Sequence, residues 1–202
     1  MDTGEIKAEL LMSYSEQVDY LLKKYGSAKY DYFYNESCKS RDSKVSRTKE
    51  GLVCHHIDED KAIMLSSPSY AAKNKFDYQK ADRLVYCNLL EHLLLHIKIV
   101  MEPRHPEANL FEIPGVGGIV NICRTLNDYY GGRECKREYQ KKLYEPISDN
   151  MKDYIAILIY LIVFVKTNRP GCLSVLNEEN LTTDSYGEVV EELSKWVYSP
   201  SS

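Results

Sequence analysis

Two stretches decide the fold, GLVCHHID (residues 51–58) and RLVYCNLLEHLLLHIKIV (residues 83–100). The first begins at a glycine and is rich in residues that favour β-structure, so it predicts a strand over residues 51–57. The second predicts another strand over residues 82–87, followed by a helix over residues 88–101 with apolar residues at helical spacing. An acidic turn and a polar loop lie between the two strands. The expected order is therefore strand, connector, strand and helix.

The start of this helix carries a capping signal. Asn88 is a favourable N-cap residue, and Glu91 stands three residues later, as in a capping box. We expect both residues to have this structural role. Glu91 could also orient a metal-binding histidine by a hydrogen bond to the ring nitrogen that does not face the metal.

Four of the five histidines fall into two groups, His55-His56 and His92-x-x-x-His96. Residues four apart on a helix lie on one face, so the second pair can bind a single metal ion. A third ligand can come from the end of the first strand, where the chain turns. The fourth histidine would stay unbound, with a pKa near neutrality, and could accept a proton from water. The spacing alone leaves open which member of the first pair does which.

Residues 51–100 resemble the HNH (ββα-metal) endonucleases. VCHHID (53–58) is similar to the paired histidine that ends the first strand in that family. RLVYCNLLEHLLLHIKI (83–99) is similar to the second strand and helix, with the E-H-x-x-x-H ending of phage and homing-type members and the H-x-x-x-H of colicin-type nucleases.

The resemblance implies a role for each histidine and for the loop. His56 would be the general base. The family's middle asparagine, which holds the loop, corresponds to a position on or near Arg83, where Asp82 is a possible substitute tether. The metal ligands would be His55, His92 and His96.

These patterns predict a metal-dependent nuclease that hydrolyses phosphodiester bonds, with DNA as the expected substrate and RNA as the alternative. One divalent ion is expected, either Mg²⁺, Mn²⁺, Zn²⁺ or Ni²⁺. Two other readings remain open. One is a catalytically silent accessory protein of a phage or mobile element that binds nucleic acid or protein. The other is a structural zinc site in a helical interaction protein.

Charge limits how the chain could bind nucleic acid. The net charge of −4 over 202 residues argues against coating through bulk positive charge, so a local basic group is needed. The polar loop over residues 36–50 offers one, although a solvated surface loop is an equally good interpretation. Its candidate phosphate-binding residues are Lys39, Arg41, Lys44, Arg47 and Lys49.

The expected fold class is α+β, mostly α-helical, with a small ββα-metal core. We expect an N-terminal helix and basic loop over residues 1–50, the core over 51–102, and a helical region over 103–202 packed on the core. The N-terminal helix is predicted over residues 5–25. Further helices are predicted over residues 116–130, 133–144, 148–168 and 186–198.

Six cysteines without any C-x-x-C spacing indicate reduced, mostly buried thiols and no zinc ribbon. The most apolar run, residues 154–165, is shorter than the roughly 20 residues of a membrane span, so it predicts a buried helix. No signal peptide is recognisable. The expectation is a cytoplasmic protein without a membrane segment.

Overall fold

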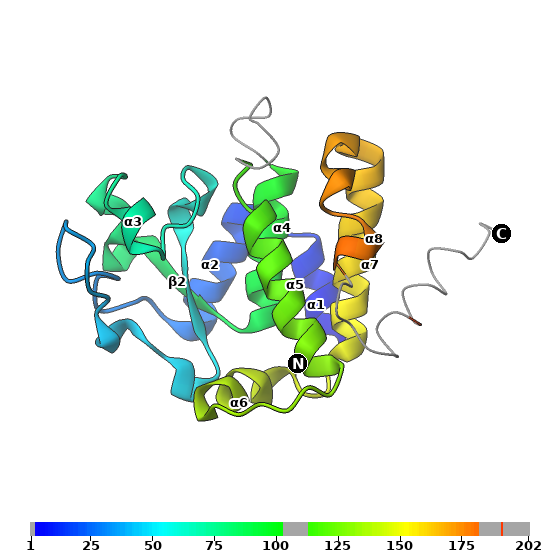
Figure 1. Cartoon of the computed structure of the whole chain (residues 1–202), viewed down its shortest axis with the longest axis horizontal. Coiled ribbons are helices and arrows are strands. Elements are labelled where there is room, and N and C mark those ends of the chain that lie inside the picture. The colour runs from blue at the N-terminus through cyan, green and yellow to red at the C-terminus, as the bar shows by residue number, and fades with distance from the viewer. Residues whose placement is uncertain (1–2, 103–112, 182–190, 192–202) are drawn as a thin grey trace.

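The computed structural model describes residues 3–102, 113–181 and 191. It confirms the α+β class, because helices dominate around a small antiparallel sheet. The sheet pairs β1 (Val53–His56) with β2 (Leu84–Cys87). Figure 1 shows the long helix after β2 standing between this sheet and the C-terminal helices.

The strand–connector–strand–helix order is confirmed. In the sheet, His55 lies opposite Val85 and His56 opposite Leu84. Asn88 then follows β2 and caps α4 (Leu89–Met101). Its side-chain oxygen accepts hydrogen bonds from the backbone N–H groups of residues 90 and 91, and its own N–H donates to the Glu91 carboxylate at 2.7 Å. The predicted capping box therefore fixes the direction in which α4 leaves the sheet.

The single helix expected over residues 5–25 is wrong, because two helices occupy this stretch. They are α1 (Thr3–Leu10) and α2 (Tyr14–Tyr25). Ser13 separates them by capping α2, and it forms a capping box with Glu16. The break places Tyr14 at the start of α2, where its side chain reaches β1.

The connector between the strands is folded rather than open. It begins with a 3-10 turn, η3 (Ile57–Asp60), that leaves directly from β1. Before β1, Phe33 and Arg41 form an isolated antiparallel β-bridge. The remaining short elements are η1 (Ser43–Val45), η2 (Thr48–Glu50), α3 (Pro68–Ala71), η4 (Phe76–Gln79) and η5 (Ala81–Arg83).

Helices fill the C-terminal half. The helix predicted over residues 116–130 is confirmed. The helices predicted over 133–144 and 148–168 are present, but each begins a few residues later than predicted. The helix predicted over 186–198 lies outside the described residues apart from Glu191. The elements are α5 (Val116–Tyr130), α6 (Glu138–Tyr144), η7 (Glu145–Ile147), α7 (Met151–Asn168), η8 (Pro170–Ser174) and α8 (Glu178–Leu181).

The main hydrophobic core joins α4 to α5 and α7. Leu90 and Leu94 of α4 are fully buried in one cluster with Ile119 of α5 and Leu158 and Leu161 of α7. Of the helices that the structure describes, none combines the length and apolar character needed to cross a membrane. All six cysteines are free.

Candidate metal centre

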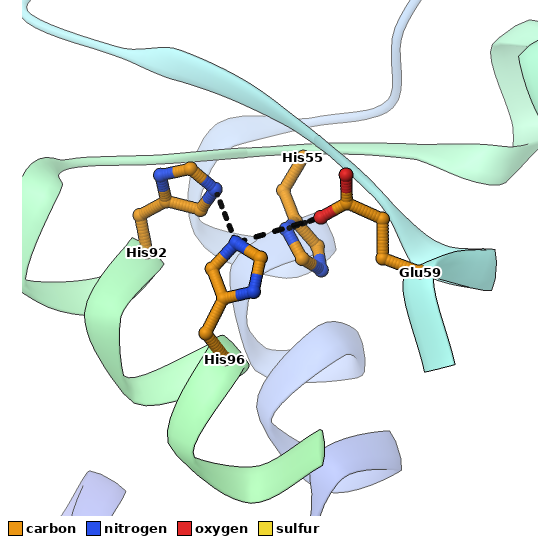
Figure 2. Close-up of side chains that lie close together, drawn as sticks. All are labelled: His55, Glu59, His92 and His96. Carbon is orange, nitrogen blue, oxygen red and sulfur yellow. Dashed lines mark hydrogen bonds and ion pairs between the residues drawn. The ribbon is translucent and has the colours of Figure 1, made fainter. Parts of the chain in front are cut away.

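Three histidines and one glutamate converge between the sheet and α4. His55 comes from β1, Glu59 from the turn that follows it, and His92 and His96 from successive turns of α4, as Figure 2 shows. One ligand atom from each lies within 4.8 Å of the other three. This group is close enough to hold a metal ion.

The distances identify the atoms that face one another. The Nε2 atoms of His92 and His96 are 3.1 Å apart. One Glu59 carboxylate oxygen lies 3.2 Å from Nδ1 of His55 and 3.4 Å from Nε2 of His96. The three imidazole rings pack with centroid separations of 4.7–5.2 Å. The converging set is therefore three imidazole nitrogens and one carboxylate oxygen.

Burial keeps this group uncharged when no cation is bound. It raises the pKa of Glu59 to about 8 and lowers the pKa of His96 to about 4. The pKa values of His55 and His92 also fall well below their usual value, first through burial and then through the neighbouring histidines. The close His–Glu contacts are thus not ion pairs near pH 7. A divalent cation would reverse the balance for Glu59, because it stabilises the carboxylate and uses neutral imidazole lone pairs.

Tyr14 sets the orientation of His55. Its hydroxyl donates to the backbone oxygen of Ile57 at 2.9 Å and lies 3.0 Å from Nε2 of His55. Because the hydroxyl hydrogen is used on Ile57, Nε2 of His55 must donate to the tyrosine oxygen. Its Nδ1, which is buried and makes no hydrogen bond, is then left with a lone pair aimed at the cluster. A buried nitrogen lone pair that faces a carboxyl oxygen at 3.2 Å fits a metal ligand.

Glu59 is the candidate ligand that the sequence patterns missed. It sits in a run of three acids, Asp58 to Asp60, and nothing in the pattern distinguishes the middle one. The turn after β1 places Glu59 four residues beyond His55 and directs its side chain back toward that histidine. The Glu59 side chain is 12% exposed. The neighbouring Asp58 instead contacts Arg83 and Lys61.

His56 lies beside the cluster and does not belong to it. It is 1% exposed, its Nε2 lies 2.8 Å from the side-chain oxygen of Gln79, and the Tyr32 ring packs 4.4 Å from its own. Burial lowers its pKa to about 4, although the Gln79 contact opposes this. The expected pKa near neutrality is therefore wrong, and His56 is a neutral imidazole across the physiological range.

Arg83 ties down the connector by a contact that the sequence does not reveal. Its guanidinium donates two hydrogen bonds of 2.6 Å to the buried carboxylate of Asp58. This joins the turn after the first histidine pair to the residue that precedes β2. Lys61 contacts the same carboxylate. Asp82, the suggested substitute tether, is exposed and makes no such contact among the described residues.

Glu91 acts as a structural residue. Besides its capping contact with Asn88, its carboxylate accepts from Lys24 at 2.9 Å and from the Tyr25 hydroxyl at 3.1 Å. These contacts join the start of α4 to the end of α2. Among the described residues, Glu91 makes no hydrogen bond to a histidine. The structure therefore gives no support to the expectation that Glu91 orients a metal-binding histidine.

Of the basic residues in the loop over residues 36–50, one is held by hydrogen bonds and the other four are exposed. Arg47 is held by Glu50 and by the backbone oxygen of Tyr25. Arg41 is exposed and stacks at 4.5 Å on Tyr32, whose ring also contacts His56. This places one cation of the loop next to the histidine site. The other three, Lys39, Lys44 and Lys49, are exposed.

A cavity of about 330 Å³ opens onto the cluster. His56, Glu59, His92 and His96 form one side of it, and the first turn of α5 forms another. This turn approaches closely because residue 118 is glycine. A Cβ atom at Gly118 would lie 2.3 Å from the His96 ring.

Comparisons with known proteins give no further guide to the site. A scan of protein-family models, a search of curated proteins and a search of solved structures each return no match. The functional argument therefore rests on the residues and their geometry.

Proposed function

We propose that this chain is a metal-dependent nuclease that hydrolyses phosphodiester bonds of DNA. The observation that carries the proposal is one cavity lined both by a candidate metal cluster and by a neutral histidine outside it. A metal ion beside a positioned base is the minimal equipment for attack of water on a phosphodiester.

His55, Glu59, His92 and His96 would hold one divalent ion. When bound, the ion supplies a Lewis acid that stabilises negative charge on the phosphate oxygens and on the leaving oxygen. Three imidazoles with one carboxylate favour Zn²⁺, Mn²⁺ or Ni²⁺ over Mg²⁺ for binding. Access from the cavity side supports a reacting phosphate there, since three of the four side chains line that cavity.

His56 would act as the general base. It is neutral at pH 7, so it can accept the proton of the attacking water as the new phosphorus–oxygen bond forms. Arg41 stands on Tyr32 next to it and would contact a phosphate of the substrate backbone. The exposed lysines of the same loop would extend this contact, which agrees with binding through a local basic group on an acidic chain.

The test is cleavage of supercoiled and linear plasmid DNA by purified protein loaded with Mg²⁺, Mn²⁺, Ni²⁺ or Zn²⁺, with structured RNA in parallel. The expected result is nicking of DNA that EDTA abolishes. His56→Ala should remove cleavage and keep bound metal, whereas His92→Ala should lose both. Intact DNA under all four ions between pH 6 and 9 refutes the proposal, and cleavage confined to RNA corrects the substrate.

A structural zinc site is the second candidate. One observation favours it: four protein ligands can complete a tetrahedral shell, which is typical of structural rather than catalytic zinc. In that case, removing the metal should unfold the protein, and His56→Ala should change no activity. Unfolding monitored by circular dichroism during EDTA titration, run beside the cleavage assay, separates the two candidates.

A further inference from the structure

Gln79 is a buried amide at which three segments of the chain meet. It ends η4 and is fully buried. Its side-chain nitrogen donates to the backbone oxygen of Leu65 at 3.2 Å, across the connector. Its own backbone oxygen accepts from the N–H of Tyr32 at 2.7 Å. A side chain so constrained cannot rotate without leaving buried polar groups unpaired.

The remaining polar atom of this amide faces His56. Because the carbonyl of Leu65 can only accept, the amide nitrogen must face Leu65 and the amide oxygen must face His56. The oxygen lies 2.8 Å from Nε2 of the histidine. Nε2 must therefore carry the hydrogen, and the lone pair of the neutral ring resides on Nδ1.

A second contact, with the Tyr32 ring, also holds the His56 ring in place. The backbone N–H of Tyr32 is hydrogen-bonded to Gln79, and the centroid of the Tyr32 ring lies 4.4 Å from that of the His56 ring. His56 is 1% exposed and lines the cavity with Glu59, His92 and His96. Of its two nitrogens, only Nδ1 remains for a reaction in that cavity.

We propose that Gln79 is a positioning residue that holds His56 in the Nε2–H tautomer, so that Nδ1 is the atom that accepts the proton. The catalytic use of that tautomer rests on the proposed nuclease function, whereas the tautomer itself does not. An amide suits this role because it carries no charge into the buried site and its nitrogen can hold the connector at the same time.

The first test is a two-bond ¹H–¹⁵N correlation spectrum of Zn²⁺-loaded protein with ¹⁵N-labelled histidine, recorded near pH 8. The His56 signals are assigned by their loss in His56→Asn. The expected pattern is that of a protonated Nε2 and a bare Nδ1. The opposite tautomer in the wild-type protein overturns the proposal without any variant at Gln79, and so does a fast mixture of the two.

The second test compares Gln79→Met with Gln79→Glu. Methionine has a similar length and offers no acceptor, so the tautomer should become mixed. In the cleavage assay, kcat should fall by about 100-fold, the lower end of what a positioned base contributes, with KM unchanged. Glutamate restores an acceptor, so the Nε2–H pattern and most of kcat should return. Zn²⁺ affinity should stay within about twofold in both variants, since neither change touches the cluster.

These readouts separate the inference from the function on which its use depends. Wild-type protein that shows the Nε2–H tautomer and cleaves no nucleic acid refutes the nuclease and leaves the positioning by Gln79 standing. Gln79→Met that keeps the tautomer and a wild-type kcat overturns the positioning role in an active nuclease.

Discussion

Replacing Glu59 with glutamine should weaken metal binding and stabilise the metal-free protein, two effects of opposite sign. Glutamine keeps the shape of the side chain and removes the carboxylate. Loss of a charged ligand should weaken Zn²⁺ binding by at least about 100-fold, or about 2.8 kcal/mol, because even changes behind the ligands cost 10–100-fold. Competition with a chromophoric chelator measures this affinity.

The stabilisation follows from the raised pKa of Glu59. Burial moves that pKa from 4.5 to about 8, so between these values the folded, metal-free protein keeps a proton that the unfolded chain releases. The contribution of Glu59 to stability therefore falls as pH rises from 4.5 toward 8. At about 1.4 kcal/mol per unit, the penalty at pH 7 is about 3 kcal/mol. Glutamine has no proton to lose and removes the penalty.

Urea unfolding in EDTA at pH 5 and pH 7 measures the second effect. The four histidines with lowered pKa values add stability to both proteins over this range, so the informative quantity is the difference between variant and wild type. The advantage of Glu59→Gln over wild type should grow from about 1 kcal/mol at pH 5 to about 3 kcal/mol at pH 7. Glu36→Gln, at an exposed carboxylate far from the ligand set in sequence, is the matched control and should follow the wild type. Unchanged Zn²⁺ affinity in Glu59→Gln would show that Glu59 is no ligand. A less stable metal-free variant at pH 7 would refute the account of its burial.

Three further changes test the surroundings of the site. Tyr14→Phe removes the group that orients His55, so Zn²⁺ affinity should fall by about 10–100-fold in the same titration. Gly118→Ala should lower the free energy of unfolding by about 1–3 kcal/mol through overpacking, whereas Gly117→Ala, where a Cβ meets open space, should be neutral or stabilising. Arg41→Ala should weaken DNA binding and reduce the slope of log K against log salt by about 1, and an unchanged slope would remove Arg41 from the interface.

Local rules predicted the parts of the site that are local. The spacing of His92 and His96 pairs them on any helix, and Asn88 with Glu91 marks where that helix begins. The same reasoning could have divided the N-terminal helix, because Ser13 and Glu16 have the spacing of a capping box. The apolar residues continue at helical spacing across this break, and this pattern predicted one helix although the capping signal was present.

The rest of the site depends on contacts between distant residues. Gln79 meets His56 across 23 residues of connector, and Tyr14 meets His55 across 41. Neither residue type marks a site by itself. Glu59 was hidden for a different reason, since the direction of each acid in the turn after β1 depends on the hydrogen bonds of that turn and on Arg83 holding its neighbour.

The glycine contact between α5 and His96 bears on how this chain can be divided. A fragment ending after α4 would contain every candidate ligand and the candidate base, yet it would lack the helix that walls the cavity and covers the His96 ring. The apolar face that α4 presents to α5 and α7 would also become exposed to water. The strand–strand–helix unit is therefore not an independent structural unit in this protein. Grafting it onto another scaffold would require the first turn of α5 to be included.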